Sequence, residues 1–160
     1  MNSDRIEKSV VLRAPLDRVW RAISDAEQFG RWFGARFDGP FVAGAFVTAA
    51  ITPTTVDDEV AKRQEPHAGV KSTWEIVAVE PKRRFAYRWH PFAVEPDVDY
   101  DREPTTLVEF TLAEVADGLL LTIVESGFDA IPQARRRGSF EANSEGWAMQ
   151  TDLVRRFVES

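Results

Sequence analysis

The stretch FEANSEGWAMQTDLVRRFV, residues 140–158, predicts most of one long helix that we expect to run from about Pro132 to Val158. At 100° per residue, its charged side chains gather on one face, and its apolar side chains lie on two flanks of a remaining arc of roughly 200°. The middle of that arc holds Asn143, Gly146 and Gln150. A glycine inside a helix costs about 1 kcal/mol relative to alanine. The line that should be most buried is therefore small and polar, whereas the core-facing stripe of an ordinary helix is apolar.

This central line predicts open space between the helix and a sheet that wraps around it. Buried Asn and Gln amides need hydrogen-bond partners, and water, strand side chains or a ligand can provide them. The alternative is that Gly146 lets the sheet approach the helix closely while nearby backbone satisfies both amides. We favour the cavity, because no large apolar side chain fills the centre of this helix face.

Before this helix, the sequence predicts one strand, two short helices and then a series of strands. Ile6–Arg13 alternates with a period of two, Leu16–Ile23 has the apolar spacing of a helix, and Asp25 can cap a second helix over Glu27–Trp32. Short turns such as Asp117-Gly118 imply an antiparallel meander for the later strands. These strands are expected at Ala35–Phe37, Ala43–Ile51, Val70–Val79, Arg84–His90, Thr105–Leu112 and Leu119–Glu125.

Two connections between the expected strands are longer than turns. Thr52–Gly69 is polar and contains two prolines, and Pro91–Pro104 is acidic and bounded by prolines. Loops of this length inside a compact domain are often lids or binding loops. The sequence does not decide whether these two act as lids.

Composition is typical of a globular chain, and we assign residues 1–160 to a single domain. Hydrophobic residues make up 44% and charged residues 29% of the sequence, both ordinary values. The net charge of -6 and the lack of a basic face argue against a nucleic-acid partner. The first residues contain no apolar leader, and no apolar run is long enough for a membrane span. We therefore expect a cytoplasmic protein with no membrane partner.

Several stretches in this order resemble one known superfamily. They are APLDRVWRAISDAEQFGRWFG (residues 14–34), RRFAYRWHPF (83–92), TTLVEFTL (105–112), LTIVESGFDAIP (121–132) and the pair Asn143…Gly146-Trp147. Together they resemble the START-like (SRPBCC) superfamily, and within it the branch of activator of heat-shock-protein ATPase homologue-like proteins. The resemblance covers nearly the whole chain and implies an α+β helix-grip fold. In that fold a curved antiparallel sheet of six to seven strands wraps around the long C-terminal helix, with two short helices after the first strand.

The resemblance implies a largely apolar internal cavity, but it does not fix an activity. Relatives include lipid and hormone binders, polyketide cyclases, toxin-sequestering resistance proteins and a co-chaperone domain. Fold likeness alone cannot choose among them.

Glu125 is the candidate for chemistry. Leu121, Ile123 and Glu125 share one face of a strand, and the two apolar residues predict that this face is buried. A carboxylate buried there should have a raised pKa and could act as a proton donor, a base or a ligand anchor. The alternatives are that Glu125 pairs with an arginine such as Arg88 or lies exposed at the end of the strand.

Aromatic side chains are placed to line an apolar pocket with a few polar groups, as small-molecule sites usually are. Each alone fits the core better than a ligand contact, and the group as a whole, around a helix with a polar central line, favours a pocket. The expected ligand-binding residues are Trp32, Trp74, Trp89, Phe110, Glu125, Asn143, Gly146, Trp147 and Gln150.

The sequence indicates no metal site and no cofactor. It has no cysteine, no nucleotide-binding glycine loop and no H-E-x-x-H motif. Its two histidines, His67 and His90, lie far apart on different elements. The run DVDYDRE places acidic residues at three EF-hand positions, Asp97, Asp99 and Asp101, but Arg102 and Val108 replace the required glycine and glutamate. We expect a solvated acidic loop there.

We therefore expect a protein that binds or sequesters a small, largely apolar or aromatic ligand without chemical turnover. An enzyme of cyclase, dehydratase or hydrolase type that uses Glu125 is the first alternative. A chaperone-interaction module is the second, and the sequence shows no docking surface for it. A homodimer is left open.

Overall fold

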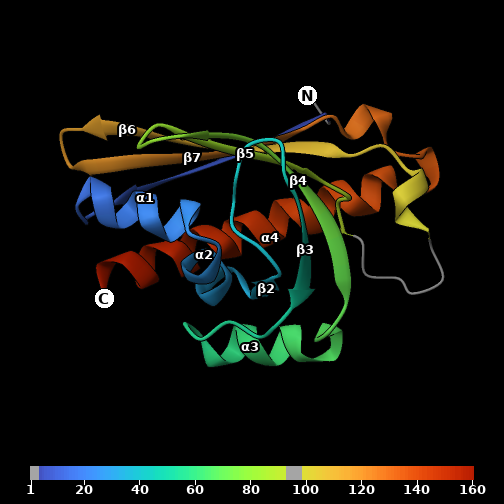
Figure 1. Cartoon of the computed structure of the whole chain (residues 1–160), viewed down its shortest axis with the longest axis horizontal. Coiled ribbons are helices and arrows are strands. Elements are labelled where there is room, and N and C mark those ends of the chain that lie inside the picture. The colour runs from blue at the N-terminus through green and yellow to red at the C-terminus, as the bar shows by residue number, and fades with distance from the viewer. Residues whose placement is uncertain (1–3, 93–98) are drawn as a thin grey trace.

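The computed structural model describes residues 4–92 and 99–160, which form one curved antiparallel sheet with two short helices and the long C-terminal helix on its concave side (Figure 1). In these ranges the seven strands run in the spatial order β1-β7-β6-β5-β4-β3-β2, so every strand from β2 to β7 pairs with its neighbour in sequence. This confirms the predicted α+β helix-grip architecture. The strands are β1 (Arg5–Leu12), β2 (Ala35–Phe37), β3 (Phe46–Ile51), β4 (Lys71–Glu80), β5 (Arg84–Trp89), β6 (Thr106–Val115) and β7 (Gly118–Ser126).

Two short helices follow β1, as predicted, and one residue separates them. Helix α1 spans Leu16–Ser24 and helix α2 spans Ala26–Phe33. Asp25 ends α1 through its backbone N–H and begins α2 by accepting a hydrogen bond from the Gln28 N–H at 3.0 Å. This aspartate therefore ends one helix and caps the next.

The long helix α4 spans Gln133–Glu159 and lies along the concave face of the sheet (Figure 1). Arg18 of α1 donates hydrogen bonds to the carbonyl oxygens of Val158 at 2.9 Å and Phe157 at 2.8 Å, which satisfies the last turn of α4. This contact holds the C-terminal half of α4 against α1. No helix in the described ranges offers an apolar run that could cross a bilayer.

A closed aromatic core fills the space between α2 and the sheet. Phe29 is fully buried at its centre, with ring centroids 4.7 Å from Trp32, 5.5 Å from Phe41, 6.0 Å from Phe85 and 5.8 Å from Phe110. The indole N–H of Trp32 donates to the carbonyl of Ala22 at 2.8 Å, so the buried polar atom of this tryptophan has its partner.

The predicted loop Thr52–Gly69 contains a helix that its sequence pattern does not predict. Helix α3 spans Asp58–Gln64 and a short 3-10 helix follows at Glu65–His67. Asp57 begins α3 by accepting hydrogen bonds from the N–H groups of Glu59 and Val60. In Figure 1, α3 lies beyond the ends of β3 and β4, away from the sheet.

Smaller differences concern strand ends and the acidic loop. Strand β3 begins at Phe46 and not at Ala43, because the Ala45 N–H bonds to the Val42 carbonyl in a tight turn and Gly44 has a φ of 89°. In the acidic run, Tyr100–Arg102 forms a short 3-10 helix. Asp97 of the EF-hand-like pattern lies outside the described residues.

Candidate functional site

Glu125 lies at the centre of a hydrogen-bond network that joins three strands to α4. Its side chain is fully buried, as the period of β7 predicts. Oε2 accepts from Trp89 Nε1 at 2.7 Å and from Thr106 Oγ1 at 2.6 Å, and Oε1 accepts from Asn143 Nδ2 and Trp147 Nε1, both at 2.9 Å. The network therefore connects β5, β6 and β7 with α4.

The alternative partner for Glu125, Arg88, is exposed. It precedes Trp89 on β5, and successive residues of a strand point to opposite faces of the sheet. Since Trp89 reaches the carboxylate from the concave side, Arg88 points away from it.

Burial and hydrogen bonding act on the pKa of Glu125 in opposite directions. Burial raises the pKa of this carboxyl above its usual value, and the four hydrogen bonds oppose that rise without cancelling it. Burial, and then the charge of Glu125, raise the pKa of the Tyr87 hydroxyl well above its ordinary value. The carboxylate thus carries a desolvation cost, and its oxygens are occupied by protein donors.

We name α3 and the 3-10 helix that follows it, residues 58–67, the α3 segment. A pocket of about 410 Å³ lies beside the Glu125 network, between α4, the α3 segment and the sheet. A smaller space of about 70 Å³, which we name the inner lobe, shares part of its wall and reaches Trp147. The inner lobe is lined by Phe33, Trp89, Asn143, Gly146, Trp147 and Gln150. The wider pocket adds, among others, Ala49, Val60, Gln64, His67, Ser72, Trp74 and Met149.

Gly146 faces open space. A Cβ atom added to Gly146 would meet no atom within 4 Å, outside its own helix backbone and chain neighbours. A Cβ added to Gly30 of α2 would lie 2.1 Å from the carbonyl oxygen of Ala35. Close approach therefore explains Gly30, and the close-approach alternative for Gly146 is wrong.

The two amides on either side of Gly146 are held in fixed orientations. Gln150 is 6% exposed, its Nε2 donates to the Phe33 carbonyl at 3.0 Å, and its Oε1 is buried without a hydrogen-bond partner. Asn143 uses its Nδ2 to bond Glu125. A buried acceptor without a donor costs free energy, so the Gln150 oxygen marks a place where the protein alone does not complete its hydrogen bonds.

The α3 segment closes one side of the pocket through few contacts. Val60 is the one buried residue of α3. Gln64 donates from Nε2 to the Phe33 carbonyl at 3.1 Å and accepts at Oε1 from the Thr54 N–H at 2.8 Å. Since Gln150 binds the same Phe33 carbonyl, this oxygen joins the α3 segment to α4.

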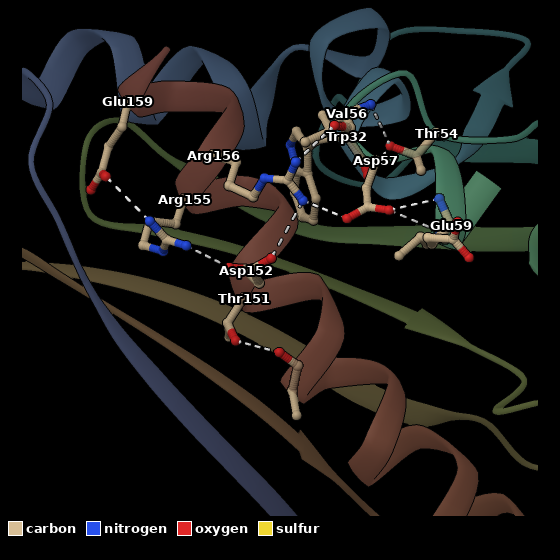
Figure 2. Close-up of polar contacts among 12 residues, drawn as sticks. Trp32, Thr54, Val56, Asp57, Glu59, Thr151, Asp152, Arg155, Arg156 and Glu159 are labelled. Carbon is tan, nitrogen blue, oxygen red and sulfur yellow. Dashed lines mark hydrogen bonds and ion pairs between the residues drawn. The ribbon is translucent and has the colours of Figure 1, made fainter.

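A surface contact holds the beginning of α3 to the C-terminal end of α4 (Figure 2). Arg156 donates to Asp57 and, at 3.4 Å, to the carbonyl of Val56. The hydrogen bond from the Val60 N–H, and next the one from Arg156, lower the pKa of Asp57. Asp57 therefore serves both as the cap of α3 and as its link to α4.

The residues that the sequence predicted as a site fall into three places. Trp74, Trp89, Asn143, Gly146 and Gln150 line the pocket, with Trp147 in the inner lobe. Glu125 lies behind this wall and contacts it through the network. Trp32 and Phe110 lie in the closed aromatic core. Their roles in ligand binding stay predictions.

Other pocket residues were not predicted from the sequence. Phe33 and Met149 line the pocket, and Gln64 and His67 come to it from the unpredicted α3 segment. The cap residue Asp57 was the local signal for that segment. His67 and His90, far apart in sequence, both line the pocket, yet within residues 4–92 and 99–160 no three metal-ligand side chains gather into a metal site.

A family model described as "Activator of Hsp90 ATPase homolog 1-like protein" matches residues 13–159. The chain belongs to this family. The match of the Hsp90 ATPase activator-like family covers both short helices, six of the seven strands and α4. None of the curated proteins matches the chain.

Solved structures share the fold at low sequence identity. DynU16, a protein of the dynemicin biosynthetic locus, is 24% identical with a TM-score of 0.68, and the match covers 98% of this chain and 48% of DynU16. This member of the Hsp90 ATPase activator-like family thus spans about half the length of DynU16. MLL2253 from Mesorhizobium loti is 19% identical with a TM-score of 0.69, covering 97% of this chain and 96% of its own. CV1439 from Chromobacterium violaceum is 21% identical with a TM-score of 0.69, covering 99% of both chains.

Proposed function

We propose that this protein binds a small, largely apolar, aromatic molecule in the pocket between α4, the α3 segment and the sheet. The observation that carries the proposal is the open space facing Gly146 on the side of α4 that borders the pocket. A larger side chain at this position would occupy the pocket, so the glycine keeps that space free at a cost in helix stability.

The size and the walls of the pocket support this function. Its volume of about 410 Å³ lies in the range of small-molecule sites, roughly 300–1,000 Å³. Phe33, Trp74, Trp89 and Met149 supply aromatic and thioether surface, which suits an aromatic ligand through ring packing and sulfur–aromatic contact. Amide groups lie among these walls and can orient a ligand, and the charged side chains of Arg63 and Glu145 also border the pocket.

The environment of Glu125 favours binding over acid–base catalysis. Each carboxylate oxygen already accepts two hydrogen bonds, and the side chain is fully buried behind Trp89 and Trp147. A general acid or base must reach the proton that it transfers, directly or through one water. The network uses Glu125 to hold the pocket wall, so we place the enzyme alternative second.

A methionine label tests the proposal directly. The sequence has two methionines, and Met149 lines the pocket, so methyl-labelled protein gives a signal from the pocket. We expect titration with 2-methylnaphthalene, an apolar aromatic probe, to shift the Met149 methyl resonance saturably through ring currents. No saturable change at Met149 would contradict the proposed function.

A further inference from the structure

We propose that Gln150 determines ligand specificity, and that the inner lobe selects molecules that donate a hydrogen bond, such as an aromatic hydroxyl or amine. This inference rests on the proposed function of the pocket. It concerns which ligands bind there and which side chain distinguishes them.

The orientation of Gln150 is fixed by the protein. Its Nε2 donates to the Phe33 carbonyl, and a carbonyl can only accept. The amide therefore cannot exchange the positions of its nitrogen and oxygen without losing this bond. Oε1 is left buried and without a partner, in a side chain that is 6% exposed and that lines the inner lobe. The missing group is a donor.

Asn143, two turns earlier on the same face of α4, also binds the protein through its nitrogen, but its Oδ1 is not a buried atom without a partner. Its Nδ2 donates to the Glu125 carboxylate, which in its charged form can only accept. No hydrogen bond to Asn143 Oδ1 occurs within residues 4–92 and 99–160. Both amides that line the inner lobe thus bind the protein through nitrogen, and Gln150 is the one of the two whose oxygen is buried without a partner.

The aromatic walls of the inner lobe do not reverse this preference. The indole N–H groups of Trp89 and Trp147 both donate to Glu125, so neither tryptophan offers its donor to a ligand. The negative carboxylate behind the wall also disfavours an anionic group in the lobe. A neutral ligand that donates a hydrogen bond fits these charges and partners best.

Gln64 provides an internal control for Gln150. Both side chains line the pocket and both donate to the same Phe33 carbonyl. They differ at the oxygen, because Gln64 Oε1 accepts from the Thr54 N–H at 2.8 Å and Gln150 Oε1 has no partner. A preference for donor ligands should therefore depend on Gln150 and not on Gln64.

The test compares two probes of nearly equal shape, 2-naphthol and 2-methylnaphthalene, whose hydroxyl and methyl groups differ in the ability to donate. We measure both affinities by calorimetry on the full chain and its variants, with the Met149 methyl signal as the report of binding in the pocket. The wild-type protein should bind 2-naphthol about tenfold more tightly, as expected when one buried acceptor gains its donor. Gln150→Met should bring the ratio of the two affinities close to one, and Gln64→Met should keep it.

The possible failures are distinguishable. Equal affinity of the wild-type protein for both probes overturns the inference and leaves the proposed function standing, since the pocket then binds aromatic molecules without distinguishing donors. A tenfold ratio that survives in Gln150→Met also overturns it. Absence of binding by either probe contradicts the proposed function itself. Thermal unfolding of Gln150→Met and Gln64→Met measures whether either substitution lowers stability. The ratio of the two affinities of the wild-type protein tests the inference even if Gln150→Met is destabilised.

Discussion

The C-terminal half and the middle of α4 contact the rest of the protein in different ways. In the C-terminal half, Leu153, Val154 and Val158 are at most 2% exposed and pack into the core. In the middle, the equivalent line consists of Asn143, Gly146 and Gln150, and it borders the pocket. One continuous helix therefore forms a closed interface at one end and an open one in its middle.

The difference shows that the middle of α4 gives up part of its apolar packing and borders a pocket instead. Burying one large aliphatic side chain contributes about 1.5–3 kcal/mol, and the middle of α4 forgoes that contribution at three positions. The Glu125 network lies beside the open part and connects α4 to β5, β6 and β7 through polar contacts. We infer that hydrogen bonds to one buried carboxylate help to hold the helix where its central line, Asn143, Gly146 and Gln150, contributes no large apolar side chain.

The largest effect should come from removing the carboxylate of Glu125. Glu125→Ala leaves buried donors on Trp89, Trp147 and Thr106 without their acceptor, and we expect it to lower the unfolding free energy by about 3–5 kcal/mol. Glu109→Ala, at a partly exposed ion pair with Arg84, is the control and should cost about 1 kcal/mol or less. Chemical denaturation measures both, and similar values for the two variants would refute the structural role of the network.

A pair of truncations one turn apart compares the two halves of α4. Leu153 is fully buried in the closed half, so Leu153→Ala should cost about 2–5 kcal/mol by creating a cavity. Met149 lines the pocket, so Met149→Ala enlarges a space that already exists and should cost less than about 1 kcal/mol. Equal losses of unfolding free energy would mean that the middle of α4 is packed as tightly as its end.

The buried charge should give the protein a distinct pH dependence. Because the pKa of Glu125 is raised in the folded state above its ordinary value of 4.5, the folded protein holds this proton more tightly than the unfolded chain. The contribution of Glu125 to stability is then fully present below pH 4.5 and decreases as pH rises through the folded pKa. We expect the difference in unfolding free energy between wild type and Glu125→Gln to change in that direction across this window. A difference that stays constant with pH would contradict the raised pKa.

The smallest effect on global stability concerns α3, the cover of the open half. Asp57→Ala removes both the helix cap and the contact with Arg156 (Figure 2), so amide hydrogen exchange in α3 should accelerate while exchange in β7 stays unchanged. Asp58→Ala, at an exposed neighbouring position, is the control and should leave α3 protected. Uniform acceleration across α3 and β7 would show that the segment does not open independently.

The sequence predicted the architecture because its strongest signals are local and periodic. The cap at Asp25, the alternation of β1 and β7, and the small polar line of α4 each follow from spacing alone. The inward position of Glu125 followed from the apolar residues that precede it on its strand. These features do not depend on contacts between distant segments.

What the sequence did not predict depends on tertiary contacts or on weak local patterns. Helix α3 has a single buried residue, Val60, so it carries no apolar stripe, and only the cap at Asp57 indicated it. Trp32 and Trp74 could not be assigned from their spacing to core or pocket, because an aromatic side chain suits both. The four hydrogen bonds to Glu125 come from residues up to 36 positions away, and no local pattern connects them.

The most direct test of the account compares two glycines of α4 in one experiment. A Cβ added to Gly138 or to Gly146 meets no atom within 4 Å, but only Gly146 lines the pocket. Gly138→Leu and Gly146→Leu should both fold at least as stably as the wild type, with a gain of up to about 1 kcal/mol from helix propensity. We measure the melting temperature and the affinity for 2-naphthol on each variant. The account predicts that Gly138→Leu binds like the wild type and that Gly146→Leu loses binding because its side chain fills the pocket; unchanged binding by Gly146→Leu would contradict it.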